Sequence, residues 1–277
     1  MTEATGTVLV GVDDTPQAWL AADWAAREAT LRGAALQVVH AVTDADARVR
    51  GAAADLLEDA RTRITTAHPV LRIDTVLGQG EPAEAVLTAA EDTDAGLIVL
   101  GTRGRGGFAG LLLGSVSLKV AAHAGRPVVV ARGHTEKAGH DGIVAGVRDE
   151  RDEDAVRFAL AEADLRGAPV RLVHAWSPLA RAGLMVPQVS TLDDEQHAHA
   201  QILKHAAHPA AAYPRLHVEQ ELIAGPPAGV LVEASAKAGL LVLPRHPAEG
   251  RFGLRLGSVV HAVLHHADCP VAVVPTS

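Results

Sequence analysis

Short apolar segments alternate with longer amphipathic segments along the first half of the chain. The apolar segments are rich in β-branched residues, as expected for parallel strands covered by helices on both faces; they span residues 7–12, 35–42, 72–77, 96–101 and 127–132. The first intervening segment has recognisable helix ends, because Thr15 before Pro16 is typical of an N-cap and Gly33 of a C-terminal stop. The alternation predicts an open, doubly wound α/β sheet of five parallel strands flanked by helices.

The same order of segments occurs a second time. Residues 31–42 (LRGAALQVVHAV) recur as residues 165–176 (LRGAPVRLVHAW), and other segments match in the same sequence order. Between the two copies lies a polar, glycine-containing stretch, residues 133–142, that has no hydrophobic periodicity. The repeat predicts two tandem domains, residues 1–135 and residues 140–277, each with its own five-stranded sheet.

Composition narrows the function classes. The 277 residues are 48% hydrophobic and carry a net charge of −8, and no block of Lys and Arg suggests contact with nucleic acid. No apolar run approaches the roughly 20 residues that span a bilayer. The single cysteine, Cys269, excludes an internal disulfide and fits a reducing compartment. We therefore expect a cytoplasmic protein that binds neither nucleic acid nor membrane.

A glycine-rich stretch follows the fourth predicted strand. Residues 101–117 (GTRGRGGFAGLLLGSVS) contain six glycines and lead into a predicted helix. In doubly wound sheets, ligands bind at the carboxyl ends of the strands, where glycine permits close backbone approach and a helix N-terminus attracts anions. The stretch could bind phosphate or could be only a flexible connection. The chain has no Gly-Lys pair, which excludes a P-loop, and a loose dinucleotide pattern at residues 104–109 does not follow the first strand.

The spacing of this stretch resembles the ATP motif of the universal stress proteins, here in a tandem two-domain form. The motif, G-2x-G-9x-G-(S/T), is matched by Gly101, Gly104, Gly114 and Ser115, and the resemblance continues along nearly the whole chain. It implies the fold of that family, which is similar to the adenine nucleotide alpha hydrolases, with ATP as the ligand. Mg²⁺ could accompany the nucleotide.

The resemblance also implies the residues that contact ATP. The Asp that follows the first strand, Asp13, would meet the adenosine end, backbone groups at Ala41 and Val42 would meet adenine, and the residues after Gly114 would hold the phosphates. The full set is Asp13, Ala41, Val42, Gly101, Arg103, Gly104, Gly114, Ser115, Val116 and Ser117. A departure from the family pattern is Asp14, whose carboxylate either faces solvent or repels the phosphates.

The second copy lacks the decisive motif residues. Pro244 and Pro247 stand where the first copy has Gly101 and Gly104, and Arg148 replaces Asp13. Proline has no N–H to donate and cannot adopt a left-handed turn. We therefore expect the first domain to bind ATP and the second to bind it weakly or not at all. Because the second copy folds without these glycines, the sequence attributes Gly101 and Gly104 to the ligand.

Two groups of histidines could suggest metal binding. One comprises His261, His265 and His266 with Cys269, and the other comprises His197, His199, His205 and His208 in an alanine-rich helical stretch. The first group is matched in the first copy by Leu118, Ala122, His123 and Arg126, so the set of ligands is not part of the repeat. Neither group is assigned as a metal site.

We expect a nucleotide-binding stress protein in which ATP is a signal or a structural ligand. No catalytic residues are assigned and the chain is not expected to be an enzyme, although weak ATPase activity is left open. The alternatives are a nucleotide-dependent hydrolase or nucleotidyl transferase, and an interaction module without nucleotide. The resemblance implies an intramolecular pseudo-dimer of the two domains, a homodimer could form in addition, and the signalling partner is unknown.

Overall fold

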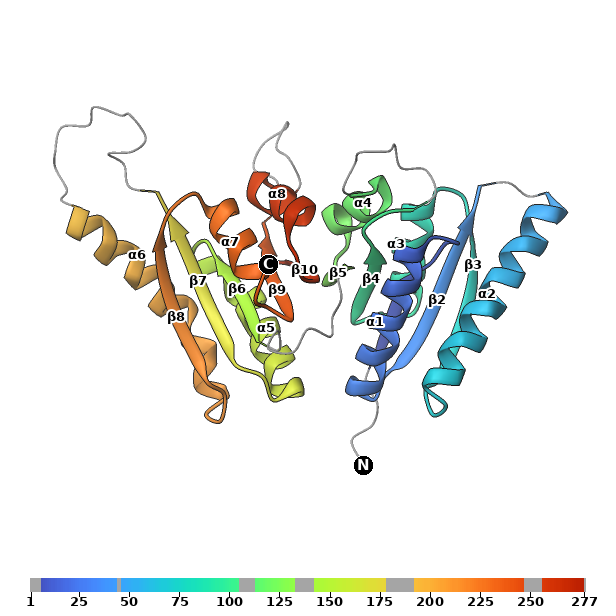
Figure 1. The fold of residues 1–277 in the computed structure, drawn as a ribbon, viewed down its shortest axis with the longest axis horizontal. Coiled ribbons are helices and arrows are strands. Elements are labelled where there is room, and N and C mark those ends of the chain that lie inside the picture. The colour runs from blue at the N-terminus through green and yellow to red at the C-terminus, as the bar shows by residue number, and fades with distance from the viewer. Residues whose placement is uncertain are drawn as a thin grey trace. The chain divides into compact units, whose positions relative to one another are not determined.

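The computed structural model describes residues 6–43, 46–104, 113–132, 142–177, 192–246 and 256–276. The chain divides into two compact units, residues 1–132 and residues 133–277 (Figure 1).

The N-terminal unit alternates strands and helices as the hydrophobic pattern predicts. Its elements are β1 (Thr7–Gly11), α1 (Pro16–Arg32), β2 (Ala35–Val42), α2 (Ala47–Ala67), β3 (Ile73–Gln79), α3 (Pro82–Asp92), β4 (Leu97–Gly101), α4 (Ser115–His123) and β5 (Val128–Ala131). Its strands run parallel in the order β3-β2-β1-β4-β5. The chain therefore reverses its direction of winding beside β1, between β1 and β4.

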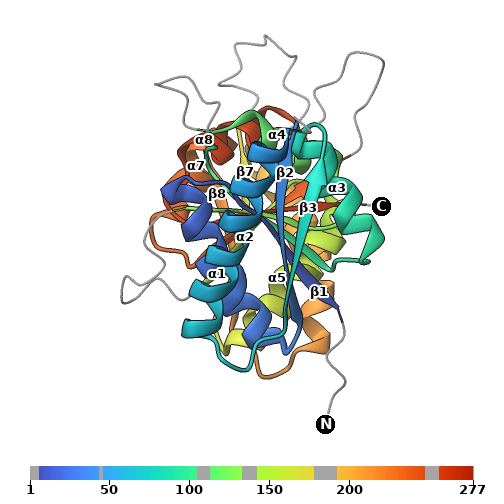
Figure 2. The same ribbon diagram turned by 90° about the vertical axis from the view of Figure 1, so that its right-hand side faces the viewer.

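Helices cover both faces of this sheet. Helices α1 and α2 contact each other on one face, and α3 and α4 contact each other on the opposite face. Figure 2 shows α1 and α2 on one side of β2 and β3, with α3 on the other. Because both faces are covered, β4 and β5 are buried along their whole length.

The ends of α1 follow from single residues. The hydroxyl of Thr15 accepts the N–H of Ala18 at 3.3 Å, and Pro16 occupies the first helical turn. Gly33 ends the helix in the left-handed conformation, with φ 64°, and its N–H reaches the last carbonyls of the helix. Both ends agree with the sequence prediction.

The C-terminal unit has the same architecture. Its elements are β6 (Ile143–Val147), α5 (Glu153–Arg166), β7 (Val170–Trp176), α6 (Leu192–Ala206), β8 (Val218–Ala224), α7 (Pro227–Ser235), β9 (Leu240–Arg245), α8 (Ser258–His266) and β10 (Val271–Pro275), with 3-10 turns at Glu150–Asp152 and His208–Ala212. Its strands are parallel in the order β10-β9-β6-β7-β8.

The strand register repeats between the two units. Val8 of β1 pairs with Leu97 of β4, and Ile143 of β6 pairs with Leu240 of β9. Gly101 lies opposite Ala131, just as Pro244 lies opposite Val274. The two parallel five-stranded sheets confirm the predicted fold class, and the register confirms that Pro244 stands at the position of Gly101.

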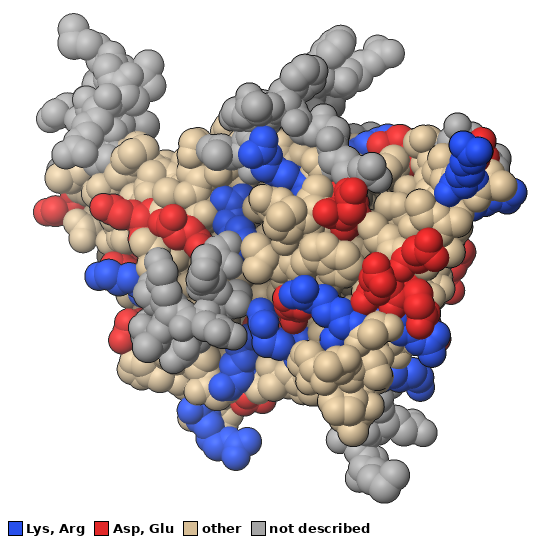
Figure 3. Space-filling view, turned by 45° about the vertical axis from the view of Figure 1, so that its right-hand side comes forward, with Lys and Arg blue, Asp and Glu red and all other residues tan. Residues whose placement is uncertain are grey.

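Charged side chains of both signs are interspersed over the face displayed in Figure 3. Among the described residues, no helix combines the length and the apolar character needed to cross a membrane.

Candidate functional site

Asp13 lies just beyond the carboxyl end of β1 and is held by the residues that start α1. Its Oδ1 accepts the backbone N–H of Thr15 at 3.0 Å and the Thr15 hydroxyl at 2.5 Å. The carboxylate is half-buried, whereas the neighbouring Asp14 is exposed. Asp14 therefore faces solvent, as one of the two sequence interpretations expected.

The first part of the glycine-rich stretch packs directly against Asp13. The Thr15 hydroxyl lies 3.3 Å from the carbonyl oxygen of Arg103, so the β1 end and the β4 end are joined. A Cβ at position 104 would lie 2.7 Å from Oδ2 of Asp13. Gly104 thus lets the β4 turn pass beside the carboxylate. Two residues predicted to contact the nucleotide, Asp13 and Gly104, are brought together.

Packing against α1 explains why position 101 is glycine. This finding corrects the attribution of Gly101 to the ligand. A Cβ at position 101 would lie 2.7 Å from the backbone carbonyl oxygen of Gln17, in the first turn of α1. Backbone cannot move aside as a flexible side chain can, so the close approach of α1 to the end of β4 requires glycine. In the C-terminal unit, where Pro244 occupies this position, a 3-10 turn, Glu150–Asp152, precedes α5. The comparison of the two copies therefore does not isolate a ligand requirement.

The second part of the motif forms the start of α4. Gly114 is the N-cap residue, its N–H donates to the carbonyl of Thr102 at 2.7 Å, and no side chain caps the helix. The first N–H groups of α4 are therefore not satisfied by a capping side chain. Ser115 is exposed at this end, Val116 is half-buried, and Ser117 is buried.

The end of β2 contributes the third side of the candidate site. Ala41 is half-buried and Val42 is buried where β2 ends beside β3. The Nδ1–H of His40 donates to the carbonyl oxygen of Val12 at 2.8 Å, which joins β2 to the residue before Asp13. Strands β2 and β4 are both neighbours of β1, so the predicted site residues gather at one edge of the sheet. Residues 105–112 of the glycine-rich stretch lie outside the described residues.

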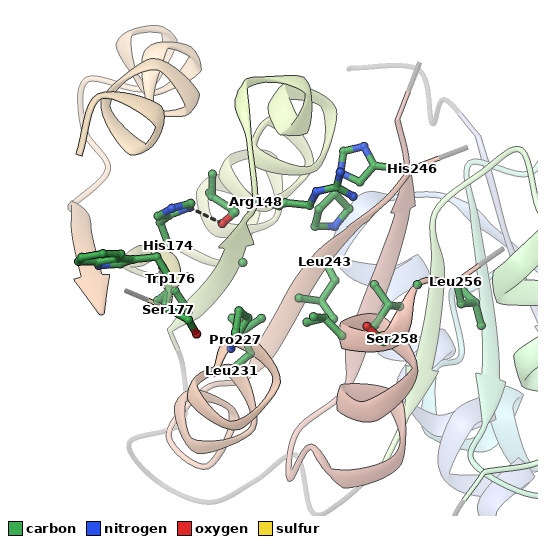
Figure 4. A pocket seen from close by; sticks show the side chains of 18 of the residues that line it. Arg148, His174, Trp176, Ser177, Pro227, Leu231, Leu243, His246, Leu256 and Ser258 are labelled. Carbon is green, nitrogen blue, oxygen red and sulfur yellow. Dashed lines mark hydrogen bonds between the residues drawn. The ribbon is translucent and has the colours of Figure 1, made fainter. Parts of the chain in front are cut away.

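The C-terminal unit contains a cavity of about 600 Å³ at the equivalent edge. Apolar side chains including Leu231, Leu243 and Leu256 line it, together with Arg148 beyond β6 and Ser258 at the start of α8. In Figure 4, His174 and Trp176 lie on one side of the cavity, and Arg148 lies beside His246 on the other. The sequence predicted the loss of motif residues here, but it did not predict a cavity with this lining.

Two histidines and a tryptophan form a connected group on one wall of the cavity. The Nδ1–H of His174 donates to the carbonyl of Val147 at 2.9 Å, which repeats the bond of His40 (Figure 4). Burial is the main cause that lowers the pKa of His174, and His199 lowers it further against the opposing effect of the Val147 carbonyl. The neutral ring therefore accepts at Nε2, and His199 of α6 donates from Nδ1 at 2.8 Å. The His199 ring stacks on Trp176 with centroids 4.7 Å apart.

A buried carboxylate supports the opposite wall. Asp152 is fully buried, and its Oδ2 accepts the N–H groups of Arg148 at 2.5 Å and Asp149 at 3.1 Å. Burial raises the pKa of Asp152 against these hydrogen bonds and the nearby His246. His246 Nε2 lies 2.7 Å from Asp152 Oδ1, but the two atoms are not aligned as a hydrogen bond. The contact is an ion pair when His246 is protonated.

Asp149, Asp152 and His246 also place three potential metal ligands within 4.8 Å of one another. Asp149 is engaged by Arg151, whose Nη2 lies 2.9 Å from Oδ2, and by Arg148, whose Nε lies 3.4 Å from the same oxygen. Two guanidinium groups compete with a cation at this position, so the group is better described as an ion-pair cluster.

The histidine groups named from the sequence have other arrangements. The rings of His261 and His265 contact each other in a tilted arrangement with centroids 4.6 Å apart, and Cys269 is buried with its thiol directed to the carbonyl of Pro270. Of the group in α6 and the turn that follows it, His199 reaches the cavity and His205 contacts His208. Pro247 lies outside the described residues.

Comparison with known proteins relates both units to one family. The sequence model described as the universal stress protein family matches residues 5–132 and 140–275. A universal stress protein of Mycobacterium tuberculosis strain H37Rv is 31% identical over 96% of each chain, and one of Mycolicibacterium smegmatis is 30% identical over 96% of each chain. A universal stress protein structure from Archaeoglobus fulgidus is similar in fold, with a TM-score of 0.76, 16% identity and 98% of both chains covered.

Proposed function

The chain belongs to the universal stress protein family as a tandem of two family domains, and on this premise we propose that its N-terminal unit binds ATP. The observation that carries the proposal is the contact between Asp13 and the β4 turn. Oδ2 of Asp13 lies where any side chain at position 104 would collide with it, and Thr15 links the carboxylate to Arg103. A carboxylate fixed beside a glycine turn can accept hydrogen bonds from ribose hydroxyls while the turn backbone approaches the phosphates.

The anionic end of the nucleotide would lie at the N-terminus of α4. Gly114 leaves the first N–H groups of the helix without a side-chain cap, and such groups attract phosphate. Exposed Ser115 adds a hydroxyl at the same end. Adenine would meet the backbone of Ala41 and Val42 at the adjoining end of β2.

ATP would serve this protein as a signal or structural ligand and not as a rapidly consumed substrate. The motif supplies no lysine of the P-loop kind, which supports this part of the proposal. A steady-state ATPase assay addresses this part separately.

Isothermal titration of the full chain with ATP and Mg²⁺ tests the proposal. We expect one site per chain, weakened about tenfold or more by Asp13→Asn because a charged hydrogen-bond acceptor is lost. Asp14→Asn is the matched control and should leave affinity nearly unchanged, because Asp14 is exposed and faces solvent. Equal affinity of the Asp13→Asn variant and the unaltered chain would contradict the proposal.

A further inference from the structure

The cavity of the C-terminal unit differs in chemistry from the candidate ATP site at the same sheet edge. Its volume of about 600 Å³ lies within the range of small-molecule sites. The walls are mainly apolar, with leucines from α7, β9 and the segment before α8. Such a lining favours a ligand that is mostly carbon, with few polar groups.

One wall is formed by Trp176, which is 5% exposed, and by His199, which provides a hydrogen-bonding ring nitrogen. Trp176 stands where the N-terminal unit has Val42, and His199 stacks against its indole. The Val147 carbonyl can only accept, so His174 carries its proton on Nδ1 and receives the Nδ1–H of His199 at Nε2. When the ring of His199 is neutral, this chain of bonds places its proton on Nδ1 and leaves Nε2 as an acceptor for an O–H or N–H group.

Among the described lining residues, the other wall carries the positive charge of Arg148. Arg148 replaces Asp13, and its side chain is 58% exposed where it lines the cavity. Its Nε lies 3.4 Å from Asp149, but that carboxylate is already bound by Arg151 through both oxygens. The side-chain hydrogen bond of Arg151 is the main cause that lowers the pKa of Asp149. The Arg148 guanidinium therefore keeps donor capacity for a ligand anion.

A triphosphate does not suit this wall. Asp149 and buried Asp152 lie close to Arg148 and repel multiple negative charges. Pro244 cannot supply the backbone donor that a glycine would at this strand position. A single negative charge is matched by the guanidinium of Arg148, the arginine among the described residues that line the cavity.

We infer that the C-terminal cavity binds a small planar aromatic carboxylate, with its ring against Trp176 and the leucine side chains and its carboxylate on Arg148. A ring hydroxyl or N–H group at the far end of the ligand is accepted by Nε2 of His199. This site is independent of ATP binding by the N-terminal unit.

The probe is 6-hydroxy-2-naphthoate, and 2-naphthol is the neutral comparison. In isothermal titration of the full chain we expect one naphthoate site per chain, with 2-naphthol bound about tenfold or more weakly because it lacks the charged partner of Arg148. Arg148→Gln should weaken the naphthoate by a similar factor. Asp13→Asn, the same strand position in the other unit, should leave naphthoate affinity unchanged.

The three tryptophans locate the site. In a protein labelled with ¹⁵N-tryptophan, 6-hydroxy-2-naphthoate should shift the indole signal of Trp176 and not those of Trp19 and Trp24, with Trp176→Phe identifying the signal. The inference is overturned if the naphthoate does not bind, if 2-naphthol binds equally well, or if Arg148→Gln retains the affinity for the naphthoate. It is also overturned if ATP displaces the naphthoate and shifts the Trp176 signal. Failure of Asp13→Asn to change ATP affinity would bear only on the N-terminal unit.

Discussion

The hydroxyl of Ser117 donates a 2.7 Å hydrogen bond to the carbonyl oxygen of Gly101, and the two residues lie at opposite ends of the glycine-rich stretch. Ser117 is buried, so this bond is protected from water. It joins the end of β4 to the first turn of α4 and sets the opening between them. Of the two serines of the motif, Ser117 therefore has a structural bond and Ser115 is exposed.

Ser117→Ala should destabilise the protein by about 1 kcal/mol, because one buried hydrogen bond is lost. Ser115→Ala should leave stability unchanged and weaken the binding of ATP severalfold. Urea unfolding and ATP titration of both variants provide the measurements. The assignment fails if Ser115→Ala is the destabilising change.

Gly101→Ala and Gly104→Ala should have different effects although both glycines belong to one motif. The new methyl group at position 101 meets the backbone of Gln17, so we expect destabilisation of about 1–3 kcal/mol. The methyl group at position 104 meets the Asp13 side chain, which can rotate away. Gly104→Ala should therefore keep nearly full stability and lose ATP affinity. The same two measurements distinguish the variants, and similar stability losses for both would contradict this reading of the packing.

Acidification should destabilise the C-terminal unit through His174. The pKa of His174 is lowered below 6.5 in the folded protein, chiefly by burial, so the unfolded chain takes up the proton first as the pH falls. The contribution is fully present above about pH 6.5 and is lost as the pH falls from there through the folded-state pKa. In His174→Asn the side-chain amide can still donate to Val147 without titrating. The free energy of unfolding, measured by urea between about pH 7.5 and about pH 5.5, should fall less in this variant than in the unaltered protein. An equal fall in both proteins would rule out His174 as a source of the pH dependence.

Gly33→Ala should cost about 1 kcal/mol of stability, because Gly33 ends α1 at φ 64° and alanine is strained there. The surrounding space is open, so the cost belongs to the backbone alone. Gly51→Ala is a matched control of opposite sign: Gly51 is exposed within α2, again with open space around it, and alanine should stabilise the helix by up to about 1 kcal/mol. Thermal unfolding of both variants tests the pair, and a stabilising Gly33→Ala would be incompatible with the left-handed cap.

Much of the fold was predictable because its signals are local. The strand segments, the Thr15 cap and the Gly33 stop depend on neighbouring residues and on periodicity, and the repeat placed Pro244 at the position of Gly101. The adjacency of β1 and β4 has no local signal in the sequence, and the structure shows it in the pairing of Val8 with Leu97.

The details that were not predicted depend on contacts between distant parts of the chain. The approach of Gln17 to Gly101 arises from the packing of α1 on β4. His199 could not be separated from the other histidines of an alanine-rich segment until α6 packed on β7 and brought it to His174. In the sequence, Asp152 is one of several charged residues in a row and has no sign of burial. The turn that contains it directs its carboxylate inward to the N–H groups after β6.

The bonds from His40 to Val12 and from His174 to Val147 give both units the same hydrogen bond. In each unit the bond lies immediately before a residue just beyond the strand, Asp13 or Arg148. The residue that follows the bonded carbonyl is an acid in the N-terminal unit and a base in the C-terminal unit. The charge at this position can therefore change by the exchange of one side chain, while the hydrogen bond from the histidine is kept. The two units of one chain therefore present opposite charges at equivalent positions.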